Sequence, residues 1–285
     1  MIRSLPFALG LACALTTVQP LFADEPAQRV VSIGGSVTEI AVALGAEDRL
    51  IARDSTSSFP DSITDLPDVG YVRALSPEGV LALGPDLIIA EHDAGPVEAV
   101  DVLRAAGVPF VIMPGDPTVD GIRAKILAVA DALDLPAEGA ALADQVEADL
   151  AAQAKLAATV AEPKRVLFVL SAQGGRIMAG GDGSSADGII RLAGGVNAAS
   201  GFAGFKQMTD EAVLTAAPDA IVMMDRGGDH SVQDAELFAL PSLASSPAAA
   251  SGKIIRMNGL LLLGFGPRTA EAARSLHDAL YGSGN

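Results

Sequence analysis

The chain contains very little cysteine and few aromatic residues: 1 cysteine, 2 tyrosines and no tryptophan among 285 residues. With Cys13 as its one cysteine, it can form no disulfide of its own, so its stability must come from an apolar core. Apolar residues make up 50% of the chain and charged residues 19%, a balance that excludes disorder. A chain of 285 residues is long enough to form two lobes, each with its own core.

Positive charge is also scarce. The 19 Lys and Arg residues face 35 Asp and Glu residues, which gives a formal net charge of −16. Such an acidic surface repels phosphate backbones, so we expect no nucleic-acid partner.

Enzyme motifs are lacking as well. The segment GGSVTE at 34–39 does not contain the Gly-x-Ser-x-Gly elbow of hydrolases, and AGGDGSSADG at 179–188 lacks the lysine of a phosphate-binding loop. We therefore predict that the protein is not an enzyme. A periplasmic hydrolase, the alternative, would need a nucleophile and a base that we do not find.

Residues 1–23 have the features of an export signal. They carry one positive charge at Arg3 and an apolar run from Leu5 to Leu15, and they end in the small residue Ala23. A membrane anchor is the first alternative, but the apolar run is shorter than the roughly 20 residues of a spanning helix. Lipid attachment at Cys13 is a second alternative. We expect cleavage near Ala23 and export of the remainder.

Predicted strands and helices alternate along the chain, which indicates parallel sheets covered by helices. Ser36 is expected to cap the first helix, and apolar residues recur at helical spacing in 120–135. The predicted strands are 29–35, 49–54, 86–91, 109–115, 164–171, 220–224 and 253–258, and further helices are expected near 185–194, 209–217 and 268–281.

Two features divide the chain into lobes. An alanine-rich segment from Ala137 to Val160 predicts one long helix that crosses from lobe to lobe. The phrase LSPEGVLALGPDLIIA (75–90) also matches MTDEAVLTAAPDAIVM (208–223) over 16 positions without a gap. We therefore predict an α/β clamshell of two Rossmann-like lobes joined by a single long helix. Its parts would be 1–23, 24–136, 137–162 and 163–285: the signal peptide, the N-terminal lobe, the connecting helix and the C-terminal lobe.

Four phrases carry a more specific resemblance. They are VGYVRALSPEGVLALGPDLIIA (69–90), VLFVLSAQGG (166–175), ADGIIRLAGGVNAASGF (186–202) and LLLGFGPRT (261–269). From about residue 29 to 281 the chain resembles the haemin-binding periplasmic proteins of bacterial haem ABC importers. Gly-Tyr-x-Arg followed by Leu-Ser-x-Glu-Gly is the most discriminating part; the other phrases occur in weaker form in cobalamin and siderophore binders of the same fold.

This resemblance implies a function. It implies a monomeric periplasmic substrate-binding protein that captures ferric haem b and delivers it to the permease, and indirectly to the ATPase, of an inner-membrane ABC importer. A binder of cobalamin or of a ferric siderophore is the alternative.

Tyr71 and Arg73 are the main candidates for the site. Ferric iron is a hard cation, and a phenolate is an anionic oxygen donor that serves as an axial haem ligand in other proteins. Arg73 supplies a nearby cation that would favour the phenolate or bind a haem propionate. Tyr71 as a half-buried packing residue is the alternative, and the resemblance favours the ligand.

The second lobe offers weaker candidates. Where some members of the resembling family have a histidine, this chain has Gln173, which would bind a propionate or an iron-bound water. We assign Leu262 and Phe265 to an apolar cleft wall; a buried strand is the alternative for the leucine run at 260–263.

No pair of histidines has the spacing of a metal site. His92 follows a predicted strand, at the end where α/β proteins often bind ligands, so it is the best spare candidate. Surface or capping roles are the alternative for His92, His230 and His277.

Glu78 and Glu211 occupy equivalent positions in the repeated phrase. In the resembling proteins one acidic residue on each lobe meets arginines of the permease, so the resemblance implies docking. A glutamate in the first turn of a helix also stabilises the helix end, and capping is the alternative.

Overall fold

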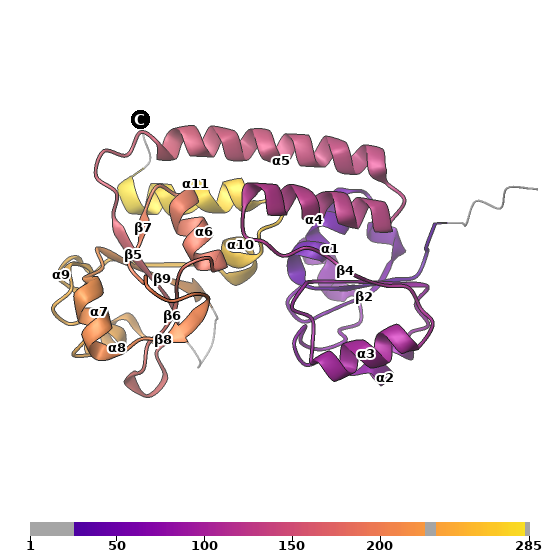
Figure 1. Ribbon diagram of the computed structural model, residues 1–285, viewed down its shortest axis with the longest axis horizontal. Helices are drawn as coiled ribbons and strands as arrows, with labels where there is room; N and C mark the ends of the chain where they lie inside the picture. Colours follow the sequence, from indigo (N-terminus) through magenta and orange to yellow (C-terminus); the bar gives the residue numbers. More distant parts are fainter. Residues whose placement is uncertain (1–25, 226–231, 283–285) are drawn as a thin grey trace, which may run out of the picture.

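The computed structural model describes residues 26–225 and 232–282, which form two α/β lobes. In Figure 1 the N-terminal lobe lies on the right and the C-terminal lobe on the left, and helix α5 (Pro136–Ala157) runs above both. Two predictions, the signal peptide with its Cys13 alternative and His230, fall outside the described residues. No helix in the described ranges has the length and apolar character needed to cross a bilayer.

The N-terminal lobe contains a four-stranded parallel sheet in the order β2-β1-β3-β4. Helices α2 and α3 cover one face of the sheet, and α1 and α4 cover the other. The strands are β1 (Val30–Ile33), β2 (Leu50–Arg53), β3 (Leu87–Ala90) and β4 (Phe110–Ile112), and the helices are α1 (Gly35–Ala43), α2 (Pro77–Leu81), α3 (Val97–Ala105) and α4 (Val119–Ala132).

The C-terminal lobe contains a mixed sheet in the order β10-β9-β5-β6-β8, with the short β7 beside β5. The strands are β5 (Arg165–Ser171), β6 (Met178–Gly180), β7 (Val196–Asn197), β8 (Phe205–Gln207), β9 (Ala220–Asp225) and β10 (Ile254–Asn258). The helices are α6 (Ser185–Leu192), α7 (Asp210–Ala216), α8 (Asp234–Phe238), α9 (Pro247–Ser251), α10 (Gly259–Leu263) and α11 (Thr269–Tyr281).

One apolar core is continuous through both lobes. It includes Val30 and Ile89 of the first sheet, Phe168 of the second, and Val146 and Leu150 of α5. Helix α5 has 22 residues and is therefore about 33 Å long, which suffices to pack on α4 in one lobe and on α11 in the other. Because this core is shared, the lobes are joined by packing as well as by the chain.

Polar contacts also cross between the lobes. Arg268 donates from Nε and Nη2 to the two carboxylate oxygens of Glu39, with both distances 2.9 Å. Gly188 of α6 lies so close to Phe265 that an added Cβ would meet the ring at 2.7 Å, so a glycine is required there. The Arg268–Glu39 pair holds the segment after α10 against the N-terminal lobe. The close packing of Gly188 on Phe265 holds the same segment against α6 within the C-terminal lobe.

The repeated phrase forms the same local structure twice. Ser76 caps α2 by accepting a hydrogen bond from the Gly79 N–H, and Thr209 caps α7 by accepting one from Ala212. Each helix is followed by a buried parallel strand, β3 or β9. The predicted α/β fold, with two lobes and a long connecting helix, is confirmed.

Several local predictions were wrong. Ser36 is not a cap, because Gly34 occupies the N-cap position and Ser36 lies within the first turn of α1. The leucine run at 260–263 belongs to helix α10 and not to a strand. The antiparallel strands β6 and β8 were not predicted, because each has only 3 residues and too short a pattern to recognise.

Candidate functional site

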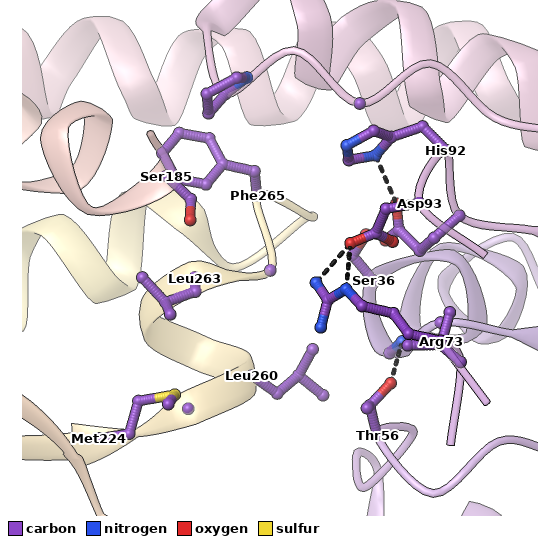
Figure 2. A pocket seen from close by; sticks show the side chains of 18 of the residues that line it. Ser36, Thr56, Arg73, His92, Asp93, Ser185, Met224, Leu260, Leu263 and Phe265 are labelled. Atoms are coloured by element: carbon purple, nitrogen blue, oxygen red, sulfur yellow. Dashed lines mark hydrogen bonds and ion pairs between the residues drawn. The ribbon is translucent and has the colours of Figure 1, made fainter. Parts of the chain in front are cut away.

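A cleft of about 960 Å³ lies between the lobes and is lined by residues of both. Figure 2 shows Ser36, Thr56, Arg73, His92 and Asp93 on one side of it and Leu260, Leu263, Phe265, Met224 and Ser185 on the other. The N-terminal wall carries polar and charged side chains, and the C-terminal wall is mostly apolar.

Tyr71 lies on the N-terminal wall, in the loop before α2. The preceding Gly70 has a φ of +95°. A residue with a Cβ rarely adopts this conformation, so a glycine is favoured where the loop begins. The Tyr71 side chain is 43% exposed, which is high for a large aromatic residue. Two backbone hydrogen bonds, from Gly95 N–H to Val72 O and from Leu75 N–H to Gly95 O, both 2.9 Å, attach this loop to the segment after β3.

Arg73 joins Tyr71 to Asp93. Its Nη1 donates a hydrogen bond to the phenol oxygen of Tyr71, and its Nε and Nη2 both donate to Oδ2 of Asp93, the Nε bond at 2.9 Å. Burial opposes the charge on the guanidinium, but Asp93 and Tyr71 outweigh it and raise the pKa of Arg73 above its usual value. The phenol oxygen therefore faces a cation that stays charged.

A buried cluster lies beside these residues. Lys125 of α4, only 3% exposed, is 3.4 Å from the Glu91 carboxylate and donates to Ser36 Oγ at 2.8 Å. It also donates at 3.3 Å to the carbonyl of Gly264, in the other lobe. Ser36 in turn donates to Glu91. The cluster thus neutralises a buried cation and links the two lobes at the cleft.

His92 extends the cluster toward solvent. Its Nδ1 lies 3.7 Å from Glu91 Oε2, and this contact outweighs burial and raises the pKa of His92. Burial alone would raise the pKa of Glu91, but the contacts with His92, Lys125 and Ser36 hold it below its usual value. Glu91 is therefore an anion paired with the Lys125 cation and, when His92 is protonated, with a second cation.

The C-terminal wall supplies apolar surface. Leu260 and Leu263 of α10 line the cleft, together with Leu170, Phe205, Met224 and Phe265. Ser184, Ser185, Asp225 and Asn258 add polar groups, but among its described residues this wall has no Lys, Arg, His or Tyr. Such a wall suits the face of a flat apolar ligand.

Not every predicted site residue lines the cleft. Leu262 is fully buried in the core, because the turn of α10 directs Leu260 and Leu263 to the opposite face. Gln173 lies in an exposed turn that does not line the cleft. His277 is buried, with Nδ1 3.0 Å from the Ala193 carbonyl oxygen, so it is a core residue.

Tyr71, Arg73, Phe265 and the spare candidate His92 do line the cleft. Glu78 and Glu211 lie outside it, exposed in the first turns of α2 and α7. Asp93, Glu91 and Lys125 also line the cleft and were not predicted from the sequence. Glu91 and Asp93 flank His92 at the end of β3, so the position that marked His92 could also have indicated them.

Within the described residues no group of three or more His, Cys, Asp or Glu side chains could hold a bare metal ion. The exposed phenol of Tyr71 presents a single oxygen donor to the cleft.

Comparison with known proteins places this geometry in context. Residues 30–259 match the family described as "Periplasmic binding protein". The chain is 30% identical over 240 residues to the vitamin B12-binding protein of Yersinia pestis (strain Pestoides F), covering 83% of both chains.

Two solved structures are also similar. The periplasmic haem-binding protein BhuT in complex with two haems matches with a TM-score of 0.83 and 40% identity, over 88% of this chain and 97% of that one. The periplasmic haem-binding protein RhuT from Roseiflexus sp. RS-1, in its apo form, matches with a TM-score of 0.85 and 39% identity, over 89% and 98%.

Proposed function

Since the chain belongs to the periplasmic binding protein family, we propose that it captures ferric haem between its lobes and delivers it to the permease of an ABC importer. The observation that carries the proposal is the exposed Tyr71 phenol, which lies in the cleft and accepts a hydrogen bond from Arg73. The similar haem-binding structures support the choice of ligand.

Tyr71 is the proposed axial ligand of the iron. A phenolate is a hard anionic donor and prefers Fe(III) to Fe(II), so reduction of the iron would weaken the bond. The Arg73 guanidinium lies against the phenol oxygen and stabilises negative charge there. On the opposite wall, Leu260, Leu263 and Phe265 would contact the porphyrin face.

Delivery to a permease is the second part of the proposal. Glu78 and Glu211 project from equivalent helix starts, one on each lobe, and no hydrogen bond or ion pair ties their carboxylates to the described residues. Two exposed acids of this kind could each meet a basic residue of a membrane partner. The family and the predicted export signal make the periplasm the proposed location.

A haemin titration with two matched variants tests the ligand assignment. The wild type should give a ferric high-spin spectrum with a tyrosinate charge-transfer band. Tyr71→Phe should lose that band and bind haemin at least about 100-fold more weakly, because it loses the bond to iron. Tyr281→Phe is the control: the hydroxyl of Tyr281 bonds to Lys164 and Gly194, and Tyr281 does not line the cleft.

The outcome also separates haem from cobalamin, the ligand named for the relative from Yersinia pestis. The same protein would be titrated with cyanocobalamin by calorimetry. An unchanged haemin spectrum in Tyr71→Phe, or tighter binding of cyanocobalamin than of haemin, would contradict the proposal.

A further inference from the structure

Asp93 contacts Arg73 closely but has no role in the proposed function. Its Oδ2 accepts from both Nε and Nη2 of Arg73, so it occupies one edge of the guanidinium. The remaining nitrogen, Nη1, donates to the Tyr71 phenol oxygen. Figure 2 shows Asp93 and Arg73 joined in this way at the N-terminal wall.

The anchor matters because Arg73 is otherwise free to move. More than half of its side chain is exposed, and a flexible arginine in water samples many rotamers. A guanidinium is planar and its donors form a fixed fork, so holding one edge determines where the opposite edge points. Asp93 is itself held in place, since the backbone of the loop that carries it bonds to Val72 and Leu75.

Direct contact with haem would be an unfavourable use of Asp93. Haem carries two propionates, and a carboxylate beside them is repelled. The negative charge of Asp93 can therefore favour haem binding only indirectly, by holding the Arg73 cation in position. Its partner Arg73 is also the group that would otherwise be drawn to a propionate.

We infer that Asp93 is a positioning residue: it keeps the Arg73 guanidinium on the oxygen of the iron ligand and away from the haem propionates. The inference rests on the proposed role of Tyr71. It assigns the specificity of this wall for haem to three residues: Asp93 positions Arg73, and Arg73 stabilises negative charge on the Tyr71 oxygen.

A double-mutant cycle tests the inference. Wild type, Asp93→Ala, Arg73→Ala and the double variant would be loaded with haemin, and haem loss to excess apomyoglobin would be timed. Asp93→Ala should release haem about 10-fold faster, in the range found for residues that orient metal ligands. Its charge-transfer band should shift toward that of Arg73→Ala. In the Arg73→Ala background the Asp93 substitution should no longer speed haem release, because the residue through which it acts is gone.

Two further variants sharpen the result. Asp93→Asn keeps an oxygen acceptor at the same reach without the charge, and should release haem at an intermediate rate. Asp234→Ala is the matched control: Arg256 donates to Asp234 Oδ1 from Nε at 3.2 Å and from Nη2 at 2.6 Å, the same geometry away from the cleft. It should leave haem release unchanged.

A measurement on the haem-free protein separates this inference from the proposed function. The Arg73 Nε–H should give a protected NMR signal in the wild type and lose protection in Asp93→Ala. The inference would be overturned, and the proposed function left intact, if Asp93→Ala had equal effects with and without Arg73. The same holds if the Nε–H signal were equally protected in Asp93→Ala and in the wild type. An unchanged haem spectrum in Tyr71→Phe would overturn the proposed function, and the role of Asp93 toward the iron with it.

Discussion

The N-terminal wall of the cleft carries Tyr71, Arg73 and Asp93, whereas the wall opposite carries Leu260, Leu263 and Phe265. Both lobes are α/β, and both contain the same capped helix followed by a strand. The difference arises in the loop before α2, in the loop after β3, and in α10 with the segment that follows it. Lobes with the same arrangement of helix and strand can therefore carry different walls, one making polar contacts and the other presenting apolar surface.

The stability of the polar wall depends on the buried ion pair between Lys125 and Glu91. Lys125→Met leaves the Glu91 carboxylate buried without its lysine, and should lower the free energy of unfolding by about 3–5 kcal/mol. Urea denaturation of the haem-free protein would measure this loss. Lys155→Met, at an exposed position of α5, should change stability by less than about 0.5 kcal/mol. A loss in Lys125→Met no greater than in this control would show that the pair contributes little.

The two lobes differ in their cleft walls, but we expect them to contribute equally to docking on the permease. Glu78→Ala and Glu211→Ala should each weaken binding to the permease about tenfold, or about 1.4 kcal/mol, without changing haemin affinity. Haem transport into vesicles that contain the importer would report the effect. Glu138→Ala, an exposed acid in the first turn of α5, is the control. Unchanged transport in both lobe variants would leave helix-end stabilisation as their role.

The apolar wall should contribute affinity but not iron chemistry. Phe205 lines the cleft, so Phe205→Ala removes apolar contact area and should weaken haemin binding about fivefold. The charge-transfer band should stay in place, because the ligand lies on the other wall. Leu214→Ala, an exposed apolar position on α7, should have no effect on either quantity. A band that moved in Phe205→Ala would mean that the two walls are not independent.

The smallest expected effect concerns pH. The raised pKa of His92 means that the folded state favours its charged form, so this contribution to stability is complete below about pH 6.5. It is lost as pH rises through the folded-state pKa. His92 is half exposed and faces Glu91 and Asp93 with Lys125 nearby, so the effect should stay below about 1 kcal/mol.

Unfolding of His92→Gln and wild type at pH 5.5 and pH 8.5 would measure the effect. The variant should be less stable than the wild type at the lower pH and equal to it at the higher pH. The opposite order would assign the contact with Glu91 a destabilising role.

The sequence was a good guide to local structure and a partial guide to the site. Strands such as 30–33 and 165–171 are short segments composed mainly of neighbouring apolar residues, and helix α5 follows from its alanines and its apolar spacing. The Gly-Tyr-x-Arg phrase led to Tyr71 and Arg73, which lie two residues apart and meet in a single loop. Leu262 was misassigned because the turn of a five-residue helix decides which leucine faces the cleft.

By itself the sequence determined the alternation of strands and helices, the repeated capped helix and the phenol beside a guanidinium. These depend on residues within a few positions of one another. The tertiary structure alone decided that Asp93 holds Arg73 from 20 positions away, and that Lys125 reaches Gly264 across 139 positions. Such partners meet only after the sheets and α5 have packed, since backbone propensity and periodicity carry no information about which distant side chains become neighbours.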